Sequence, residues 1–214
     1  MTRTSTGMLL AVFVSACAQN RQPVLNDLQE AIERETTAAL STQCMAERAA
    51  ADSIFPIEAF FKAVACSKNI MTGQFQKTLD TLGSPTYTPA FLQPDTPSDT
   101  RQNIAQGLST EQLMKQTYTN YRNRAHDNKC VQAEFVFRQA QQVSENLQRI
   151  YTYLLGNIDN RPVLAAVYLL CPNCGNLFIG TTSHVCDVCQ TPSTHFISYS
   201  ATHTDATTGA TRIE

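Results

Sequence analysis

The stretch Cys171-Pro-Asn-Cys174-Gly175 is the most informative part of the sequence. Eleven residues separate Cys174 from a second pair of cysteines, Cys186-Asp-Val-Cys189. A two-residue gap lets one tight turn deliver two sulfurs to the same ion, and four thiolates at about 2.3 Å complete a tetrahedral shell around zinc or iron. Gly175 suits the turn after the second ligand, because glycine readily adopts a left-handed backbone. The spacing predicts one iron or zinc ion held by the four cysteines, with two disulfides or four idle thiols as the alternative.

Composition describes a nearly neutral globular chain. It has 214 residues, of which 43% are hydrophobic, and a formal net charge of −2 at pH 7. That length suffices for one sizeable core and a small appendage. The chain lacks the positive excess that binding to phosphate backbones requires, so we expect no nucleic-acid partner.

The N-terminus is typical of a targeting signal. Arg3 supplies a positive charge, residues 8–14 form an apolar run too short to span a bilayer, and Val14-Ser-Ala-Cys17 is typical of a lipobox, whose cysteine receives diacylglycerol. We expect a lipoprotein signal peptide over residues 1–16 and lipidation of Cys17. The lipid anchor would hold the mature chain on a membrane of the bacterial cell envelope, on the non-cytoplasmic side. An ordinary secretory signal is the alternative.

Three further cysteines remain, Cys44, Cys66 and Cys130. An odd number is unusual for an oxidising compartment. Because all three lie in apolar segments with a helical period, we expect buried thiols. A disulfide between two of them stays open as an alternative.

Four segments carry apolar residues at the helical period: 24–48, 54–82, 100–126 and 129–155. The segment 83–99 between the second and third is rich in proline and predicts a long crossover, whereas the connection near residue 128 is short. Two helical hairpins joined by a long crossover form a four-helix bundle of the ferritin-like kind, here over residues 22–157.

The C-terminal part predicts a separate small module. Residues 163–199 surround the cysteine pairs, and short strands are expected at 167–170 and around Phe196. A segment of about forty residues seldom folds without a staple, which the metal would provide. The tail over 200–214 is rich in threonine and is expected to be disordered. The predicted fold is therefore mainly α, with a β metal ribbon at its end.

Several stretches resemble the rubrerythrin family: Asn26-Asp-Leu-Gln-Glu-Ala-Ile-Glu-Arg-Glu35, Ala59-Phe-Phe-Lys-Ala-Val-Ala, Phe137-Arg-Gln-Ala, and the ribbon from Tyr168 to Phe196. The resemblance implies a ferritin-like bundle followed by a rubredoxin-like ribbon. It further implies a di-iron site of glutamates and two Glu-x-x-His motifs, reduction of peroxide with electrons relayed through the ribbon iron, and a homodimer.

The di-iron ligands of that family are mostly replaced here. Glu35 keeps a ligand; the first Glu-x-x-His falls on Lys68 and Met71, the second on Ser144 and Leu147, and the third-helix Gly-Glu-x-x-Glu on Ser109, Thr110 and Leu113. Glu-x-x-His does not occur in the sequence. We expect the leucines and the methionine to fill space that metal occupies in an active member. The interior would then hold no di-iron centre and no catalytic residue.

Lys68 and Glu35 suggest a replacement for the lost metal charge. A lone buried carboxylate is costly to ionise, and an ammonium on a neighbouring helix would neutralise it, which makes a buried Glu35–Lys68 ion pair our hypothesis. With a different helical register, Glu58 or Glu145 would face inward instead.

The histidines are expected to have no ligand role. His126 lies near a helix end, where it would interact with the helix dipole. His184 and His195 flank the ribbon, whose four thiolates already complete the metal shell. Gln190 follows the second cysteine pair where glycine is common, so the second turn is expected to be less rubredoxin-like than the first.

The sequence thus favours a non-catalytic, membrane-tethered, metal-binding lipoprotein that acts by binding an unidentified protein partner. An enzyme that reduces peroxide, or an electron carrier that uses ribbon iron, is the alternative. Zinc would fit the first hypothesis best because it has no redox chemistry.

Overall fold

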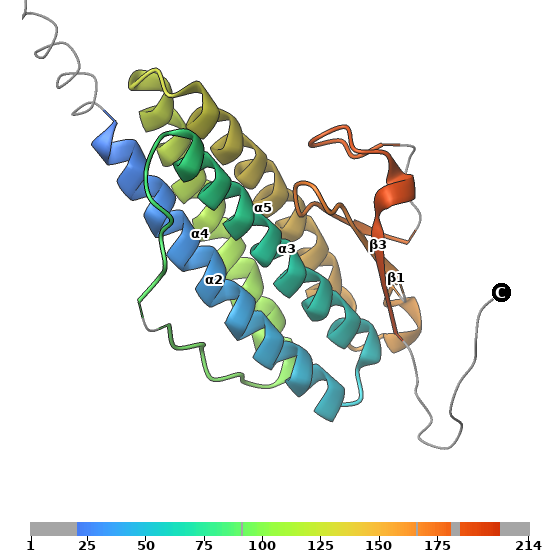
Figure 1. Ribbon diagram of the computed structural model, residues 1–214. Coiled ribbons are helices and arrows are strands. Elements are labelled where there is room, and N and C mark those ends of the chain that lie inside the picture. Colours follow the sequence, from blue (N-terminus) through green and yellow to red (C-terminus); the bar gives the residue numbers. More distant parts are fainter. Residues whose placement is uncertain (1–20, 91, 166, 181–184, 202–214) are drawn as a thin grey trace, which may run out of the picture.

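The computed structural model describes residues 21–90, 92–165, 167–180 and 185–201. Four long helices lie side by side, and a small sheet packs against one side of them (Figure 1). The helices are α2 (Gln22–Ala51), α3 (Phe55–Thr81), α4 (Thr100–Asp127) and α5 (Val131–Asn157). The predicted mainly α architecture, a four-helix bundle followed by a β ribbon, is confirmed.

The two hairpins are joined by an extended segment between Thr81 and Thr100 that runs along α2 (Figure 1). Its backbone is fixed to the helices by hydrogen bonds, from Tyr87 N to Gln76 Oε1 at 3.1 Å and from Asp95 N to Ser41 Oγ at 2.9 Å. Side chains on the helices thereby accept hydrogen bonds from backbone N–H groups of a segment whose described residues form no helix or strand.

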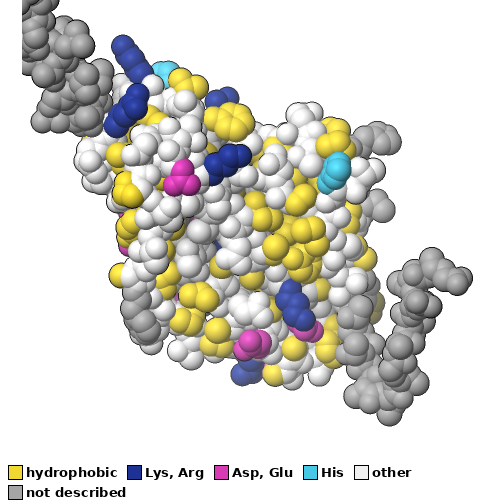
Figure 2. All heavy atoms as spheres, viewed as in Figure 1, with side chains coloured by type: hydrophobic (Ala, Val, Ile, Leu, Met, Phe, Trp, Pro, Cys, Tyr) yellow, Lys and Arg dark blue, Asp and Glu magenta, His cyan; other side chains and the backbone are white. Residues whose placement is uncertain are grey.

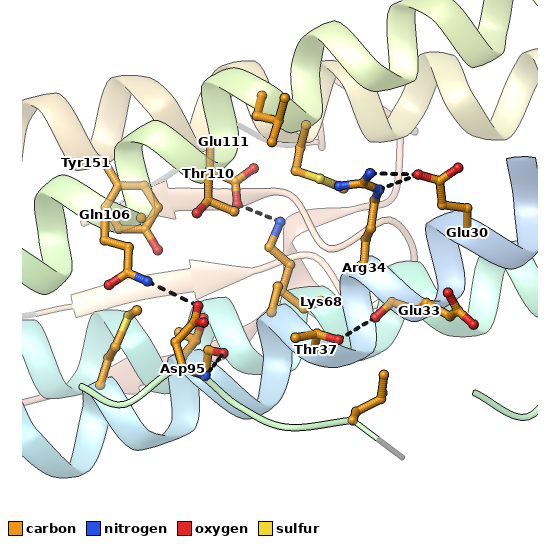
Figure 3. Close-up of a pocket in the computed structure, with 18 of the residues that line it drawn as sticks. Glu30, Glu33, Arg34, Thr37, Lys68, Asp95, Gln106, Thr110, Glu111 and Tyr151 are labelled. Atoms are coloured by element: carbon orange, nitrogen blue, oxygen red, sulfur yellow. Dashed lines mark hydrogen bonds and ion pairs between the residues drawn. The ribbon is translucent and has the colours of Figure 1, made fainter. Parts of the chain in front are cut away.

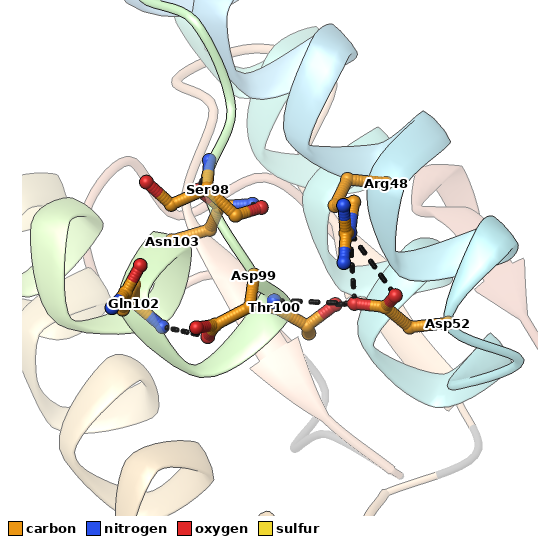
Figure 4. Close-up of polar contacts among 7 residues, drawn as sticks. All are labelled: Arg48, Asp52, Ser98, Asp99, Thr100, Gln102 and Asn103. Carbon is orange, nitrogen blue, oxygen red and sulfur yellow. Dashed lines mark hydrogen bonds and ion pairs between the residues drawn. The ribbon is translucent and has the colours of Figure 1, made fainter.

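The start of α4 is fixed by two carboxylates (Figure 4). Asp99 caps the helix, because its side chain accepts a hydrogen bond from Gln102 N at 2.8 Å. Asp52, just after α2, accepts from Thr100 Oγ1 at 2.6 Å and pairs with Arg48 Nε at 3.0 Å. The turn of the first hairpin, between α2 and α3, therefore positions the beginning of the second hairpin.

Two buried clusters fill the bundle. One, around Phe75, Tyr118 and Phe137, contains no residue of the ribbon. The other contains Phe60 and Tyr151 of the bundle together with Tyr168, Leu170 and Leu177 of the ribbon. The ribbon and the bundle consequently share a hydrophobic core.

The ribbon is a three-stranded antiparallel sheet in the order β2-β1-β3. Its strands are β1 (Val167–Leu170), β2 (Leu177–Ile179) and β3 (Ile197–Ser200). The strand expected at 167–170 is present and the one expected near Phe196 begins one residue later, whereas β2 was not expected. In the register, Tyr168 lies opposite both Ile179 and Tyr199.

The surface seen in Figure 2 carries few charged side chains, in keeping with a charged content of 16%. Among the described residues, no helix is long and apolar enough to cross a membrane. The predicted signal peptide, Cys17, His184 and most of the predicted disordered tail lie outside the described residues.

Cys44, Cys66 and Cys130 are free thiols, of which only Cys130 is fully buried.

Candidate functional site

The four ribbon cysteines converge as their spacing predicts. Their sulfurs all lie within 4.8 Å of one another, with Cys171 Sγ 3.5 Å from Cys189 Sγ and Cys174 Sγ 3.6 Å from Cys186 Sγ. Ligands at about 2.3 Å from a tetrahedral ion stand about 3.8 Å apart, close to the observed separations. The donor set and its geometry fit one zinc or iron ion.

Two similar turns present these sulfurs. Gly175 N donates to Cys171 O at 3.0 Å, and Gln190 N donates to Cys186 O at 2.8 Å. Gly175 has φ +76° and Gln190 has φ 62°, so both occupy the left-handed region. The expectation of a less rubredoxin-like second turn is wrong at the backbone level, because Gln190 adopts the conformation that glycine usually supplies.

One of the four cysteines is favoured as a thiolate, because the hydrogen bonds that lower the pKa of Cys171 raise the pKa of Cys174 and of Cys186. Hydrogen bonds from Cys174 and Cys186 hold the pKa of Cys171 far below its usual value. A thiolate, the form that binds metal, is therefore present at neutral pH. Thr191 Oγ1 lies 3.1 Å from Cys189 Sγ, and the Phe178 and Phe196 rings stack at 5.2 Å beside the cluster. His195 is exposed and takes no part.

Hydrogen bonds fix the first cysteine turn to the bundle. Ser67 of α3 donates from Oγ to Gly175 O at 2.6 Å, and Gln74 of the same helix donates to Asn173 O at 2.7 Å. A Cβ on residue 175 would lie 2.9 Å from Ser67 Oγ and from Ser67 O. Gly175 is thus required twice, for the turn and for the close approach of α3.

A second site lies inside the bundle, where Lys68 of α3 points toward Glu111 of α4 (Figure 3). Lys68 Nζ lies 2.6 Å from Glu111 Oε1 and 3.3 Å from Glu35 Oε2. The three residues are at most 2% exposed. Tyr118 donates its hydroxyl hydrogen to Glu35 Oε1. The predicted Glu35–Lys68 pair is confirmed, but Glu35 is not alone, because Glu111 completes a carboxylate–ammonium–carboxylate cluster.

The surroundings set the charge states of this cluster. Burial, and to a smaller extent the Glu111 carboxylate, raises the pKa of Glu35 despite the opposing effect of Lys68. Burial alone would lower the pKa of Lys68, but Glu111 and Glu35 outweigh it and raise that pKa above its usual value. Lys68 therefore stays protonated, and Glu35 takes up a proton more readily than an ordinary glutamate does.

The other predicted positions divide into inward and outward residues. Met71, Ser144 and Leu147 are buried as expected. Leu113 is 57% exposed, so its assignment to the core is wrong, and Thr110 is half-buried. The resemblance to the rubrerythrin family therefore predicted the wrong residues of α4 as inward-facing. The inward residues of this helix include Gly107, Glu111, Met114 and Tyr118.

Glu111 could have been found from the spacing of these inward residues. Steps of four, three and four residues place these side chains on one face of a helix, and Ile104 extends the same stripe. The alternatives weighed from sequence do not enter the interior. Glu58 pairs with Lys62 on the surface at 2.6 Å, and Glu145 pairs with Lys115 at 3.5 Å. Of the described histidines, His126 and His195 are both exposed.

No protein-family model matches this sequence, and no curated protein matches it. Solved structures of nigerythrin, a rubrerythrin-family protein, are similar to the chain. The all-ferrous, fully reduced state is 23% identical with a TM-score of 0.77, the partially reduced state gives the same values, and the mixed-valence state is 24% identical with a TM-score of 0.75. Each match covers 82% of this chain and 86% of nigerythrin. The likeness shows a shared fold, a ferritin-like bundle followed by a rubredoxin-like ribbon.

Proposed function

We propose that this protein is a rubrerythrin-like metal-binding protein in which the ribbon holds one iron or zinc ion and the di-iron centre of the bundle has been lost. The observation that carries the proposal is the Lys68 ammonium, buried between the carboxylates of Glu35 and Glu111. By the resemblance to the rubrerythrin family, Lys68 takes the position of a metal-binding glutamate, so a cation of the chain itself would stand in for the metal charge.

The interior donors do not suit a pair of metal ions. Carboxylate-bridged iron needs several oxygen ligands together with imidazole. In the described part of the chain the buried cluster offers two carboxylates, and neither described histidine is buried. The raised pKa of Lys68 keeps its positive charge in place, and that charge would repel a metal ion.

The ribbon donors, in contrast, suit a single ion. Zinc would act as a structural staple, whereas iron bound by four thiolates supplies one-electron redox chemistry. The chain's own residues hold the sulfurs in position: Gly175 and Gln190 shape the turns, and Ser67 fastens the first turn to α3. The module is built to keep an ion fixed relative to the bundle.

We further propose that the protein works at a membrane of the bacterial cell envelope, tethered through lipidated Cys17 on the non-cytoplasmic side. The motif Val14-Ser-Ala-Cys17 supports this proposal. In that setting the bundle would serve as a binding module for a protein partner, or pair with a second copy of the chain. Soluble and membrane fractions of cells that express the full chain and its Cys17→Ser variant would test the tether.

A second candidate function is electron transfer or peroxide reduction with ribbon iron. The all-ferrous and mixed-valence states described for nigerythrin favour it, because they show redox-active iron in a protein of this fold. It requires iron rather than zinc in the four-cysteine site.

Elemental analysis of the purified full chain, combined with its visible spectrum, tests the proposal. We expect one metal ion per chain. About three iron ions per chain would overturn the loss of the di-iron centre and restore peroxide reduction. With one ion per chain, zinc would support a structural ribbon, and iron with a reversible potential would support electron transfer.

A further inference from the structure

A cavity of about 720 Å³ lies between α2 and α4, beside the buried cluster. Figure 3 shows the labelled side chains converging on it from α2, α3, α4, α5 and the crossover. Lys68 and Glu111 form part of its wall, and Asp95 and Gln106 lie near its other side. The volume is that of a small-molecule pocket.

One polar atom in this wall lacks a partner. Glu111 is 2% exposed, and although its Oε1 accepts from Lys68, its Oε2 has no hydrogen-bond partner among the described residues. A buried carboxylate oxygen without a donor is rare in folded proteins, because burial removes its water. Because this oxygen has less than 1 Å² of accessible surface, a ligand N–H or O–H group in the cavity would reach it after a small shift of the Glu111 side chain.

The wall carries an excess of negative charge. Its acidic members are Glu30, Glu33, Asp95 and Glu111, and its basic members are Arg34 and Lys68. Both cations are already engaged: Arg34 lies 2.6 Å from Glu30, and Lys68 lies between the two buried carboxylates. The charge left over by these pairs is negative, so a cationic ligand would be attracted and an anionic one repelled.

Hydrophobic side chains complete the cavity. Met45 and Met114 line it from opposite helices, and the Tyr151 ring faces it. Gly107 makes room for that ring, because a Cβ at this position would lie 2.4 Å from Tyr151 Cε1. Methionines and an aromatic ring form an adaptable apolar surface that also attracts cations.

We propose that this cavity binds a small organic amine, whose ammonium group donates to Glu111 Oε2 and whose hydrocarbon part packs against Met45, Met114 and Tyr151. The inference rests on the proposed function in one respect, that Lys68 rather than a metal pair occupies the interior. Each protein sample is therefore analysed for metal, so that failure of the amine site and failure of the proposed function are told apart.

Calorimetric titration with three ligands of similar size and different charge tests the site: benzylamine, benzyl alcohol and benzoate. We expect benzylamine to bind with one site per chain, benzyl alcohol to bind at least tenfold more weakly, and benzoate not to bind. Equal binding of the amine and the alcohol, or preference for benzoate, would overturn the assignment. So would the absence of benzylamine binding to protein with one metal per chain, because Glu111 Oε2 would then stay out of reach of a ligand in the cavity.

A matched pair of variants locates the binding. Ala38 lines the cavity, and Ala38→Phe would fill it without changing a charge. Leu40 lies on the same helix, is 42% exposed and is not part of the wall, so Leu40→Phe is the control. We expect Ala38→Phe to weaken benzylamine binding more than tenfold and Leu40→Phe to leave it unchanged. Equal affinity in both variants would place the amine elsewhere.

Asp95→Asn provides a second test that leaves the buried cluster untouched. Asp95 accepts from Gln106 Nε2 at 3.1 Å near the surface, and the variant keeps the shape of the side chain. Because it removes one negative charge from the wall, we expect benzylamine binding to weaken by a few-fold, more at low than at high salt. An effect independent of salt would argue against attraction by the wall charges.

Discussion

The ribbon and the bundle interior each hold a buried cluster of ionisable side chains, and the two clusters differ in their chemistry. In the ribbon, four sulfurs lie within 4.8 Å of one another. In the interior, an ammonium lies between two carboxylates instead. The ribbon has the donors of a metal site, whereas the interior holds two carboxylates neutralised by a cation of the chain itself. Under the proposed function, this internal cation takes the place of a lost cofactor.

Electrostatics explains why Lys68 suits this role. Two buried carboxylates without a counter-ion would oppose folding, because burial penalises their charged forms. Lys68 reaches both from α3, and Tyr118 donates to Glu35 from α4. The cluster thus links three helices through polar contacts at the centre of the bundle. The comparison can be tested by breaking each region in turn.

Removal of a ribbon ligand should have the largest effect. Cys174→Ser leaves three thiolates, and we expect metal content to fall from one ion per chain to nearly none. Structural zinc contributes roughly 10 kcal/mol or more to the folding of small modules, so the ribbon should unfold. The cluster around Phe75, Tyr118 and Phe137 contains no residue of the ribbon, so far-UV helicity should persist.

Cys44→Ser is the control, since Cys44 is a free thiol of α2 outside the metal site. It should leave metal content and helicity unchanged. Loss of helicity in Cys174→Ser would contradict the prediction and would mean that the core shared through Tyr168, Leu170 and Leu177 holds the bundle together.

Removal of the interior cation should have the next largest effect. Lys68→Met leaves two buried carboxylates uncompensated, and we expect the free energy of unfolding to fall by about 3–5 kcal/mol at pH 7. The variant loses the influence that lowers the pKa of Glu35, so this pKa rises further. A carboxyl with a raised pKa in the folded state binds protons more readily when folded, so the loss should shrink as the pH falls toward 4.5, the ordinary value.

Urea unfolding between pH 4.5 and 8 measures this effect. Lys62→Met removes a surface lysine that is 49% exposed and paired with Glu58, and should cost less than about 0.5 kcal/mol. Combining Lys68→Met with Glu35→Gln and Glu111→Gln should recover most of the loss. Unchanged stability in Lys68→Met would show that the ion pairs do not hold the centre together.

The sequence predicted the ribbon ligands because their geometry is local. Two residues between cysteines determine a turn, and the turn determines where both sulfurs point. The effect of Gln190 in place of a glycine was misjudged, since a left-handed backbone is open to other residues at a modest cost. Strand β2 was missed because three residues give too short an alternating pattern.

The interior was only partly predictable because it depends on the register of long helices. Lys68 and Glu35 were paired correctly, since both positions lie on strongly patterned helices. Helix α4 is rich in Gln, Asn and Thr, so its inward face is weakly marked, and the resemblance to the rubrerythrin family placed Leu113 inside in place of Glu111. The cavity beside the cluster could not be predicted at all, because its walls come from segments far apart in the chain.

The contact between the two regions provides a smaller test. Ser67 precedes Lys68 and donates to Gly175 O, so one turn of α3 faces both sites. Ser67→Ala leaves that carbonyl without its donor, and we expect a loss of about 1–2 kcal/mol with metal content unchanged. Gln74→Ala, which removes the exposed hydrogen bond to Asn173 O, should cost less than half as much. Equal losses in the two variants would mean that burial does not increase the contribution of the Ser67 hydrogen bond to stability. A fall in metal content would show that this hydrogen bond also shapes the ion site.

The smallest expected effect comes from the second cysteine turn and is a gain. Gln190 has φ 62°, where a side chain is strained and glycine is not, so Gln190→Gly should stabilise the ribbon by up to about 1 kcal/mol. Gln190→Ala keeps the strain and should leave stability nearly unchanged. Thermal unfolding of the metal-loaded protein, monitored in the ribbon by absorption of the metal thiolates, would measure the difference. If both variants behaved alike, backbone strain would not limit this turn, and the metal would already impose its shape on any residue that follows Cys189.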